Sequence, residues 1–376
     1  MARSARRGSP LGLLLAGLLA VAVAALIVVP HLTGGGGAGS GGDHPPTTVV
    51  RALVGSEKAD FFADPAVVAR FTQAGYRLQV DTAGSREMAD RDLRGYDLAF
   101  PSDSARADLI RAKAHVDRVY VPFSSPMAIA TFRPLVALLT QRGVVTHTGD
   151  HDELSIRGYL DLVAAGTRWS DLPGNTAFRT NRSILISTTN PRTSNSADLY
   201  LAIAGYVENG DNVVADAAAA DRAVTAAAPL FAKQGYVDES SQEPFDDYLT
   251  IGMGKTPMAM IYEAQFRAHQ LARDPAITAD MTLLYPNPTI YAKHTVVPLD
   301  ATGDAVGRLL TRDPELQRLA AVHGFRTADT AYGARPAAEQ HLPAPPSLVG
   351  VADAPTAALQ ERMIKKLDAI ETGRPG

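Results

Sequence analysis

Hydroxyl and amide side chains gather at the start of a helix that the sequence predicts near the middle of the chain. An apolar run at residues 184–186 predicts a buried strand, after which the chain turns at Pro191. Thr193, Ser194 and Asn195 are favoured N-cap residues, and a largely apolar helical run follows them. Free backbone N–H groups and the positive end of the helix dipole meet at such a helix start, which could therefore bind an anion. The alternative is that one hydroxyl caps the helix and the others belong to a polar loop.

The first third of the chain contains two more junctions of this kind. Strands are predicted at residues 47–54 and 76–81, each followed by a polar helix start, and a short strand follows at residues 96–100. This β-α-β-α-β order predicts a parallel sheet with right-handed crossovers, in which the loops after the strands gather at one edge. The candidate ligand residues there are Ser56, Lys58, Gly84, Ser85, Arg86 and Ser102.

The charged residues near these junctions favour different ligands. Lys58 and Arg86 would favour an anion if they face the site, although such side chains are more often exposed on the surface. Glu57, Glu87 and Glu263 have the opposite effect, and Glu263 is predicted at the end of a buried strand. If Glu263 reaches the site, a ligand with a hydroxyl or cationic group is favoured over a bare dianion.

The run NPRTSNSA at residues 190–197 resembles the second-lobe helix start of bacterial extracellular solute-binding proteins that serve ABC importers. The resemblance is to the sulfate, molybdate and tungstate binders in particular, and it extends over roughly residues 48–330, the size of one two-lobed unit. It implies an α/β fold of two doubly wound Rossmann-like lobes joined by hinge strands, the type II periplasmic-binding-protein fold. It also implies that the ligand contacts are Ser56, Ser85, Thr193, Ser194 and Asn195. Oxyanion binders often have glycines where this chain has Asn195 and Ser196.

The resemblance also predicts how the lobes divide the sequence. We expect lobe 1 in residues 47–130 and 286–330, and lobe 2 in residues 131–285. The extended segment 119–132 corresponds to a strand that crosses between the lobes as a hinge, and its prolines leave an edge strand as the alternative. Residues 282–299 suit a second crossing back to lobe 1.

A C-terminal extension, residues 331–376, follows the two predicted lobes. It contains a predicted amphipathic helix with Leu359, Met363, Leu367 and Ile370 on one face. We expect this face to pack on the body of the protein, with contact to a partner as the alternative.

The N-terminus predicts a membrane anchor. Residues 11–29 are an unbroken apolar run behind Arg3, Arg6 and Arg7, long enough to cross a bilayer as a helix. The basic flank predicts a cytoplasmic N-terminus and an exported remainder. We therefore expect a cytoplasmic stub and signal anchor in residues 1–32 rather than a cleaved signal peptide, followed by a Gly-rich linker in residues 33–46.

The composition excludes several other classes. The chain has 376 residues, 46% of them hydrophobic, and a net charge of -4, which gives no reason to expect nucleic acid as a partner. It contains no cysteine, so a lipid-modified cysteine cannot be its membrane tether. We expect a monomer that needs no cofactor.

Two further motifs do not predict a site. The segment HTGDHDE, residues 147–153, offers metal-ligating side chains, but we expect a solvated loop without a metal, because the helical spacing H-E-x-x-H is missing. A helix is expected directly after it, over residues 153–166. No G-x-S-x-G elbow is present, so the serine hydrolase signature is missing.

The sequence therefore predicts a membrane-anchored extracellular receptor that is not an enzyme. Its two lobes would close over a small solute, an oxyanion by resemblance, and deliver it to an ABC permease. One alternative keeps the fold but makes it a sensor or a surface-complex subunit that recognises a sugar or peptide. The other is an anchored hydrolase that uses an acid such as Glu263 or Asp246.

Overall fold

The structure is a computed structural model that describes residues 47–373, apart from residues 233, 235–239 and 241. The predicted anchor and linker in residues 1–46 lie outside the described residues. Among the helices that are described, none combines the length and apolar character needed to cross a bilayer.

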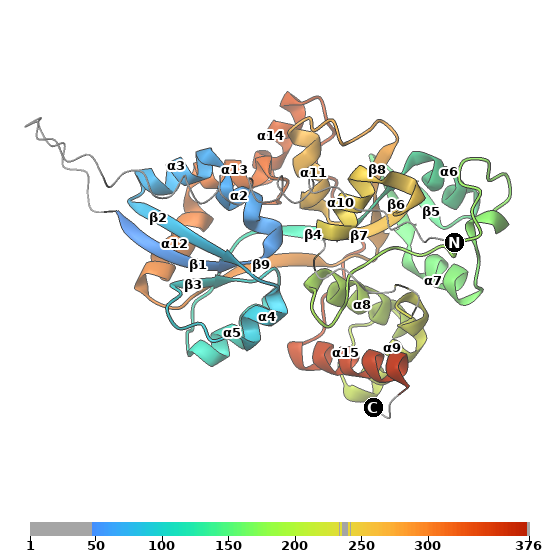
Figure 1. The fold of residues 1–376 in the computed structure, drawn as a ribbon, viewed down its shortest axis with the longest axis horizontal. Helices are drawn as coiled ribbons and strands as arrows, with labels where there is room; N and C mark the ends of the chain where they lie inside the picture. The colour runs from blue at the N-terminus through green and yellow to red at the C-terminus, as the bar shows by residue number, and fades with distance from the viewer. Residues whose placement is uncertain (1–46, 233, 235–239, 241, 374–376) are drawn as a thin grey trace, which may run out of the picture. The chain divides into compact units, whose positions relative to one another are not determined.

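Three parallel strands form the sheet of the first part of the chain, as the sequence predicts (Figure 1). β1 (Thr48–Val54) pairs in parallel with β2 (Tyr76–Thr82) on one side and with β3 (Leu98–Phe100) on the other. Right-handed crossovers of this type place helices on both faces of a sheet. The crossing segments contain η1 (Ser56–Lys58), α2 (Ala59–Ala63), α3 (Pro65–Gln73) and α4 (Ser85–Asp90), and α5 (Ser104–Ala114) follows β3.

The strands β9 (Tyr291–Pro298) and β4 (Tyr120–Phe132) extend the sheet from β3 toward the rest of the chain. The first residues of β4 pair with β9, and its last residues pair with β7 (Met258–Tyr262) and β8 (Met281–Asn287). The sheet order is β2-β1-β3-β9-β4-β8-β6-β5, with β7 added beside β4. The edge-strand alternative is wrong for the second half of β4, which lies between β7 and β8, whereas residues 120–126 pair with β9 alone apart from a single bridge between Ser124 and Arg326.

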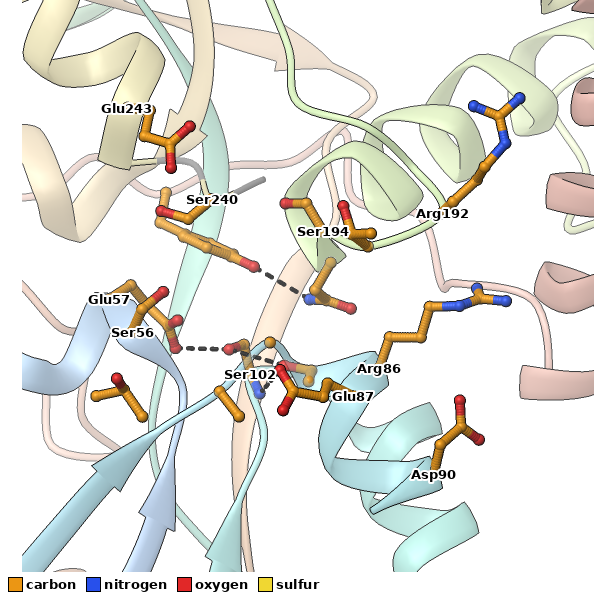
Figure 2. A pocket seen from close by; sticks show the side chains of 17 residues that line it. Ser56, Glu57, Arg86, Glu87, Asp90, Ser102, Arg192, Ser194, Ser240 and Glu243 are labelled. Carbon is orange, nitrogen blue, oxygen red and sulfur yellow. Dashed lines mark hydrogen bonds between the residues drawn. The ribbon is translucent and has the colours of Figure 1, made fainter. Parts of the chain in front are cut away.

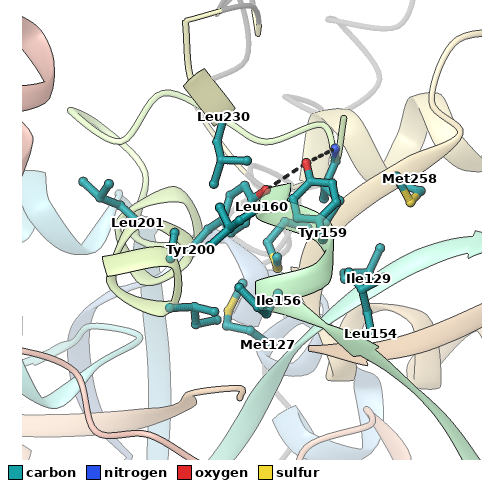
Figure 3. Close-up of a cluster of buried hydrophobic side chains, with 14 of the residues drawn as sticks. Met127, Ile129, Leu154, Ile156, Tyr159, Leu160, Tyr200, Leu201, Leu230 and Met258 are labelled. Carbon is teal, nitrogen blue, oxygen red and sulfur yellow. Dashed lines mark hydrogen bonds between the residues drawn. The ribbon is translucent and has the colours of Figure 1, made fainter. Parts of the chain in front are cut away.

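Separate hydrophobic cores define two lobes along this sheet. In lobe 1, Val50, Ala52 and Val54 of β1 face one cluster and Leu53 faces another on the opposite side of the sheet. Strands buried on both faces are typical of parallel sheets covered by helices. Lobe 2 has one large cluster, which includes Tyr159 and Tyr200 with their hydroxyls 3.2 Å apart (Figure 3).

Two local predictions for lobe 2 are wrong. Residues 147–153 are not a solvated loop but most of a hairpin between β5 (Val145–Thr148) and β6 (His151–Ser155), which turns at Gly149 with φ +62°. β6 also pairs with β8, so residues 153–155 are strand and the helix begins only at Ile156. Within the described residues, no cluster of His, Asp and Glu side chains is placed to hold a metal ion.

The segment before the central helix is buried, but it is not a full strand. Ile184 and Ile186 belong to the lobe 2 core, while Ser187 makes only a single bridge to Ala259 of β7. The helix that follows, α8, spans Asn195–Glu208 and is buried along almost its whole length. This burial fixes its N-terminus firmly against the sheet.

The remaining helices complete the two cores. In lobe 2 and its connections these are α6 (Arg133–Gln141), α7 (Ile156–Ala164), α9 (Ala217–Ala227), α10 (Gln242–Thr250) and α11 (Glu263–Leu271). α12 (Ala301–Arg312) and α13 (Pro314–Val322) cover lobe 1 and are followed by α14 (Ala331–Glu339).

The C-terminal helix α15 (Ala357–Thr372) packs on lobe 2, which confirms that part of the prediction. Met363 and Leu367 are buried in the lobe 2 core, and Ile364 joins them. Ile370, which was predicted on the same face, is 38% exposed. α15 lies against α9 and α8 and also contacts α5 of lobe 1 (Figure 1).

Candidate functional site

A polar cavity of about 460 Å³ lies between the carboxyl edge of the lobe 1 strands and the start of α8 (Figure 2). We call it the polar pocket. All the residues predicted for the site line it except Lys58 and Glu263. The predicted residues in its wall are Ser56, Gly84, Ser85, Arg86, Ser102, Thr193, Ser194 and Asn195. The lobes meet beside the pocket, where a Cβ on Gly84 would lie 3.1 Å from the Thr193 carbonyl oxygen.

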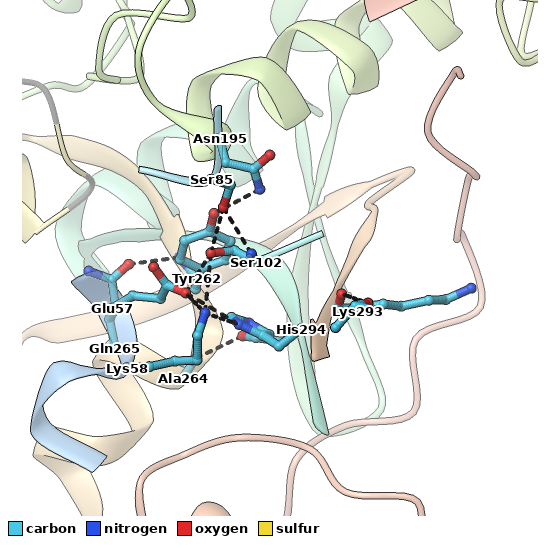
Figure 4. A network of polar contacts seen from close by, with 12 residues as sticks. Glu57, Lys58, Ser85, Ser102, Asn195, Tyr262, Ala264, Gln265, Lys293 and His294 are labelled. Atoms are coloured by element: carbon cyan, nitrogen blue, oxygen red, sulfur yellow. Dashed lines mark hydrogen bonds and ion pairs between the residues drawn. The ribbon is translucent and has the colours of Figure 1, made fainter. Parts of the chain in front are cut away.

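Two buried serines form the lobe 1 floor of the pocket. The Ser102 backbone N–H donates to Ser85 Oγ over 2.9 Å, and the Ser85 hydroxyl donates to Ser102 Oγ over 3.1 Å. The Ser102 hydroxyl in turn donates to Glu57 Oε1 over 2.5 Å (Figure 4). Both hydroxyl protons are therefore used within the protein, and the chain of donors ends on a carboxylate.

Lys58 lies beneath this floor and is fully buried, so it is neither a surface residue nor part of the pocket wall. Its ammonium pairs with Glu57, donates to His294 Nδ1 over 3.1 Å and lies 4.8 Å from the centre of the Phe100 ring. Burial lowers the pKa of Lys58, and the Glu57 carboxylate opposes this effect. His294, which contacts the Lys58 ammonium, belongs to β9 and lies 236 residues later in the chain.

Glu57 lines the pocket, although the sequence indicated it only as an acid that disfavours an anion and not as a site residue. Its side chain is 8% exposed. Burial by itself raises the pKa of Glu57, but Lys58 and His294 together hold it far below its usual range. Glu57 is therefore ionised at neutral pH. Its place in the segment GSEK was the available signal, whereas nothing local marked His294.

His294 gives this network a measurable dependence on pH. Burial and the nearby Lys58 ammonium lower the pKa of His294 to about 4. An unfolded histidine titrates near 6.5, so between these values the unfolded chain binds more protons and stability rises with pH. From pH 7 to pH 5 the His294 contribution should fall by about 2 kcal/mol. The measurement is the free energy of unfolding by urea at both pH values.

The control for this prediction is the exposed His147, whose side chain is 68% accessible. The His294→Gln variant should lose the extra pH dependence, while His147→Gln should keep it. Equal pH slopes for the wild type and His294→Gln would contradict the assignment.

The lobe 2 wall of the pocket is the first turn of α8. Ser194 occupies the N-cap position, yet its side chain makes no capping bond and instead lies 3.0 Å from Ser196 Oγ. Asn195 Nδ2 donates to the Tyr262 hydroxyl over 3.1 Å, while Asn195 Oδ1 is buried and receives no hydrogen bond from a residue that the structure describes. The simple capping alternative therefore does not describe this turn. Tyr262, which the sequence did not single out, also lines the pocket.

Glu263 does not line the pocket, although it follows the strand predicted to deliver it. It is the first residue of α11 and is fully buried. Arg326 donates two hydrogen bonds to it, over 2.6 and 2.7 Å, and the Tyr285 hydroxyl donates a third over 2.6 Å. The carboxylate is thus satisfied inside the protein, and its role is to fix α11 to the turn after α13.

Comparison with solved structures supports the same architecture. Iron-bound HitA from Pseudomonas aeruginosa matches with a TM-score of 0.54 at 12% identity, over 87% of this chain and 99% of that chain. AfuA from Actinobacillus pleuropneumoniae, a periplasmic binding protein with fructose-6-phosphate bound, matches with a TM-score of 0.52 at 13% identity, over 86% and 98%. The sulfate-binding protein SubI from Mycobacterium tuberculosis has a TM-score of 0.48 at 17% identity, over 84% and 96%.

These matches define the fold. The chain has the mixed α/β fold of the periplasmic solute-binding proteins, which confirms the predicted resemblance and the α/β class. No family model and no curated protein sequence matches the chain.

Proposed function

We propose that this protein is an extracytoplasmic receptor that captures a small solute in the polar pocket for an ABC-type importer. The observation that carries the proposal is the pocket itself, whose wall comes from the strand ends of lobe 1 and from the start of α8 in lobe 2. A cavity of about 460 Å³ has the size of a small-molecule site. The fold supports the same conclusion.

Ligand capture would work by hinge closure. β4 and β9 pass between the lobes, so rotation about them opens the pocket without unfolding either core. A solute that contacts Ser56 on one side and Asn195 on the other has those contacts together only in the closed form. It therefore shifts the population toward closure by its difference in affinity for the two forms.

The attachment and the partner complete the proposal. We infer that residues 1–32 hold the protein in the cell membrane by a single crossing and that residues 33–46 link it to an extracellular receptor domain. An ABC permease would receive the solute, and the receptor would act as a monomer without a cofactor. A neighbouring permease and ATPase in the genome would support import over the sensor alternative.

The two acids named for the hydrolase alternative, Glu263 and Asp246, both lie outside the polar pocket. Glu263 is enclosed by Arg326 and Tyr285, and Asp246 is an exposed residue of α10 that accepts a hydrogen bond from Gln242. A receptor role therefore fits the pocket better.

Binding of a small solute can be measured on the full-length protein in detergent. Titration calorimetry and thermal unfolding would use sulfate, molybdate, tungstate, phosphate, small organic acids, amines and sugars. At a concentration of 100 times the Kd, a true ligand should stabilise the protein by about 2.7 kcal/mol. Ser56→Trp should weaken binding at least tenfold, because Ser56 is exposed to the pocket and an indole there fills it.

Ser170→Trp is the matched control, since Ser170 is exposed on η2 (Trp169–Asp171) and does not line the pocket. It should leave binding unchanged. If no compound changes the melting temperature, the receptor proposal fails. If Ser56→Trp binds as tightly as the wild type, the pocket is not the site.

A further inference from the structure

We propose that the polar pocket selects a small solute that donates hydrogen bonds, an amine or a polyol, over a fully deprotonated oxyanion, because α15 neutralises the arginines of the pocket rim. This inference rests on the proposed function, since it assigns the ligand class of the same pocket. It makes the C-terminal helix a determinant of specificity.

Among the described residues, two guanidinium groups lie in the pocket wall, and both pair with carboxylates of α15. Arg86 pairs with Glu361. Arg192 donates from Nε to Asp368 over 2.7 Å and from Nη2 to Glu371 over 2.7 Å. In Figure 2 both arginine side chains extend away from Glu57 and Ser102 at the centre of the site. An anion in the pocket would therefore compete with α15 for its cationic contacts.

Lys58, a further cation that the structure describes near the pocket, is also paired. Lys58 is fully buried beneath the floor, where it pairs with Glu57 and His294. It neutralises the carboxylate that faces the site and does not itself line the pocket. The lining carboxylates are Glu57, Glu87, Asp90 and Glu243.

Two acceptors from opposite lobes remain for a ligand, beside Arg86 Nη1, a buried guanidinium nitrogen without a hydrogen-bond partner among the described residues. Glu57 Oε1 receives the Lys58 and Ser102 bonds, whereas Glu57 Oε2 receives none from any described residue. Asn195 is 7% exposed, and its Oδ1 is likewise without a donor. Buried acceptors in proteins normally have a hydrogen-bond donor, so Asn195 Oδ1 points to a donor on a bound solute, and Glu57 Oε2 offers that solute a second acceptor in the pocket wall.

The chemistry of the candidate ligands follows from this arrangement. Sulfate, molybdate and tungstate dianions carry no proton to donate, and in this pocket they would face the ionised Glu57 and two guanidinium groups whose charge is already balanced by carboxylates of α15. An ammonium group donates three hydrogen bonds and is attracted to a carboxylate. Vicinal hydroxyls can donate to Glu57 and Asn195 and also accept from the free N–H groups of the α8 start.

The first test compares ligand classes on the full-length protein in detergent. Calorimetric titrations would use putrescine and ethanolamine as amines, ribose and glycerol as polyols, and sulfate, molybdate and tungstate as oxyanions. At least one amine or polyol should bind ten times more tightly than every oxyanion, and the two groups of probes show which donor is preferred. Asn195→Leu, which removes the acceptor with little change in volume, should weaken that binding at least tenfold.

The second test removes the neutralising charges. In the Glu361→Gln/Asp368→Asn/Glu371→Gln variant, Arg86 and Arg192 lose their carboxylates, and the affinity for sulfate should rise at least tenfold. Asp221→Asn is the control, because Asp221 pairs with Arg362 of α15 and not with an arginine of the pocket. It should leave sulfate affinity unchanged.

The possible failures separate the two proposals. Tighter binding of an oxyanion than of any amine or polyol by the wild type would overturn this inference while supporting a receptor. An unchanged sulfate affinity in the folded triple variant would also overturn it. If that variant does not fold, an unchanged amine or polyol affinity in Asn195→Leu decides against the inference. Binding of no probe at all would remove both proposals.

Discussion

Replacing Arg106 with leucine should lower the free energy of unfolding by about 3 to 5 kcal/mol, the cost of breaking a buried ion pair from one side. Arg106 of α5 in lobe 1 is 2% exposed. It donates to Asp198 of α8 in lobe 2 over 2.6 Å and to Glu361 of α15 over 2.7 Å. Without the guanidinium, these carboxylates and the nearby Asp103 would repel one another.

The remaining carboxylates would respond by taking up protons. Burial already raises the pKa of Asp198 to about 6, although Arg106 opposes the rise. Loss of Arg106 removes this opposition, so the variant should be most destabilised above pH 6. Urea unfolding at pH 5 and pH 7.5 would measure the difference.

Two further variants identify the cause. Arg111→Leu changes an arginine on the same helix whose side chain is 42% exposed, and it should change stability by about 0.5 kcal/mol or less. The Arg106→Leu/Asp198→Leu double variant should recover part of the loss, since replacing both partners removes the unpaired charge. A full loss in the double variant would indicate a packing defect instead.

The same contact has a functional consequence. Arg106 joins α5 of lobe 1 to α8 and α15, so these ion pairs can form only when the two lobes are in contact. The Arg106→Leu variant should therefore populate the open form more, and small-angle scattering should report a larger radius of gyration. Ligand affinity should fall in proportion to the lost closed population.

Glu263→Gln should lower the free energy of unfolding by about 3 kcal/mol without changing ligand affinity. The substitution keeps the shape of the side chain but removes the charge that Arg326 and the Tyr285 hydroxyl contact. Arg326, whose side chain is only 15% exposed, would be left without its counterion. Urea unfolding gives the stability, and titration with the best ligand of the panel gives the affinity.

The exposed pair of Glu315 and Arg318 supplies the comparison. Both side chains are at least 40% exposed, and two hydrogen bonds join them. Glu315→Gln should change stability by about 0.5 kcal/mol or less, because water solvates both partners. A loss of ligand binding in Glu263→Gln at unchanged stability would return Glu263 to the binding site.

Much of the architecture could be predicted from the sequence because its signals are local. The strands β1 and β2 follow from apolar patterning, and Asp64 caps α3 ahead of Pro65 by accepting from the Ala66 N–H over 2.7 Å. The polar helix starts near Ser85 and Asn195 were predicted within a few residues, although in the structure no side chain caps either helix. Such features depend on neighbours along the chain, so one stretch of sequence contains all the information.

Which partner each charged side chain has, and whether that side chain faces the pocket, was decided only by the tertiary structure. Lys58 meets His294 across 236 positions, and Arg86 meets Glu361 across 275. No local pattern shows whether a lysine is buried under a pocket or an arginine is paired with the C-terminal helix. The pairing depends on which distant segments the fold brings within hydrogen-bonding distance. The sequence by itself thus determined where polar groups would gather, and the packing of remote elements decided which of them face a solute.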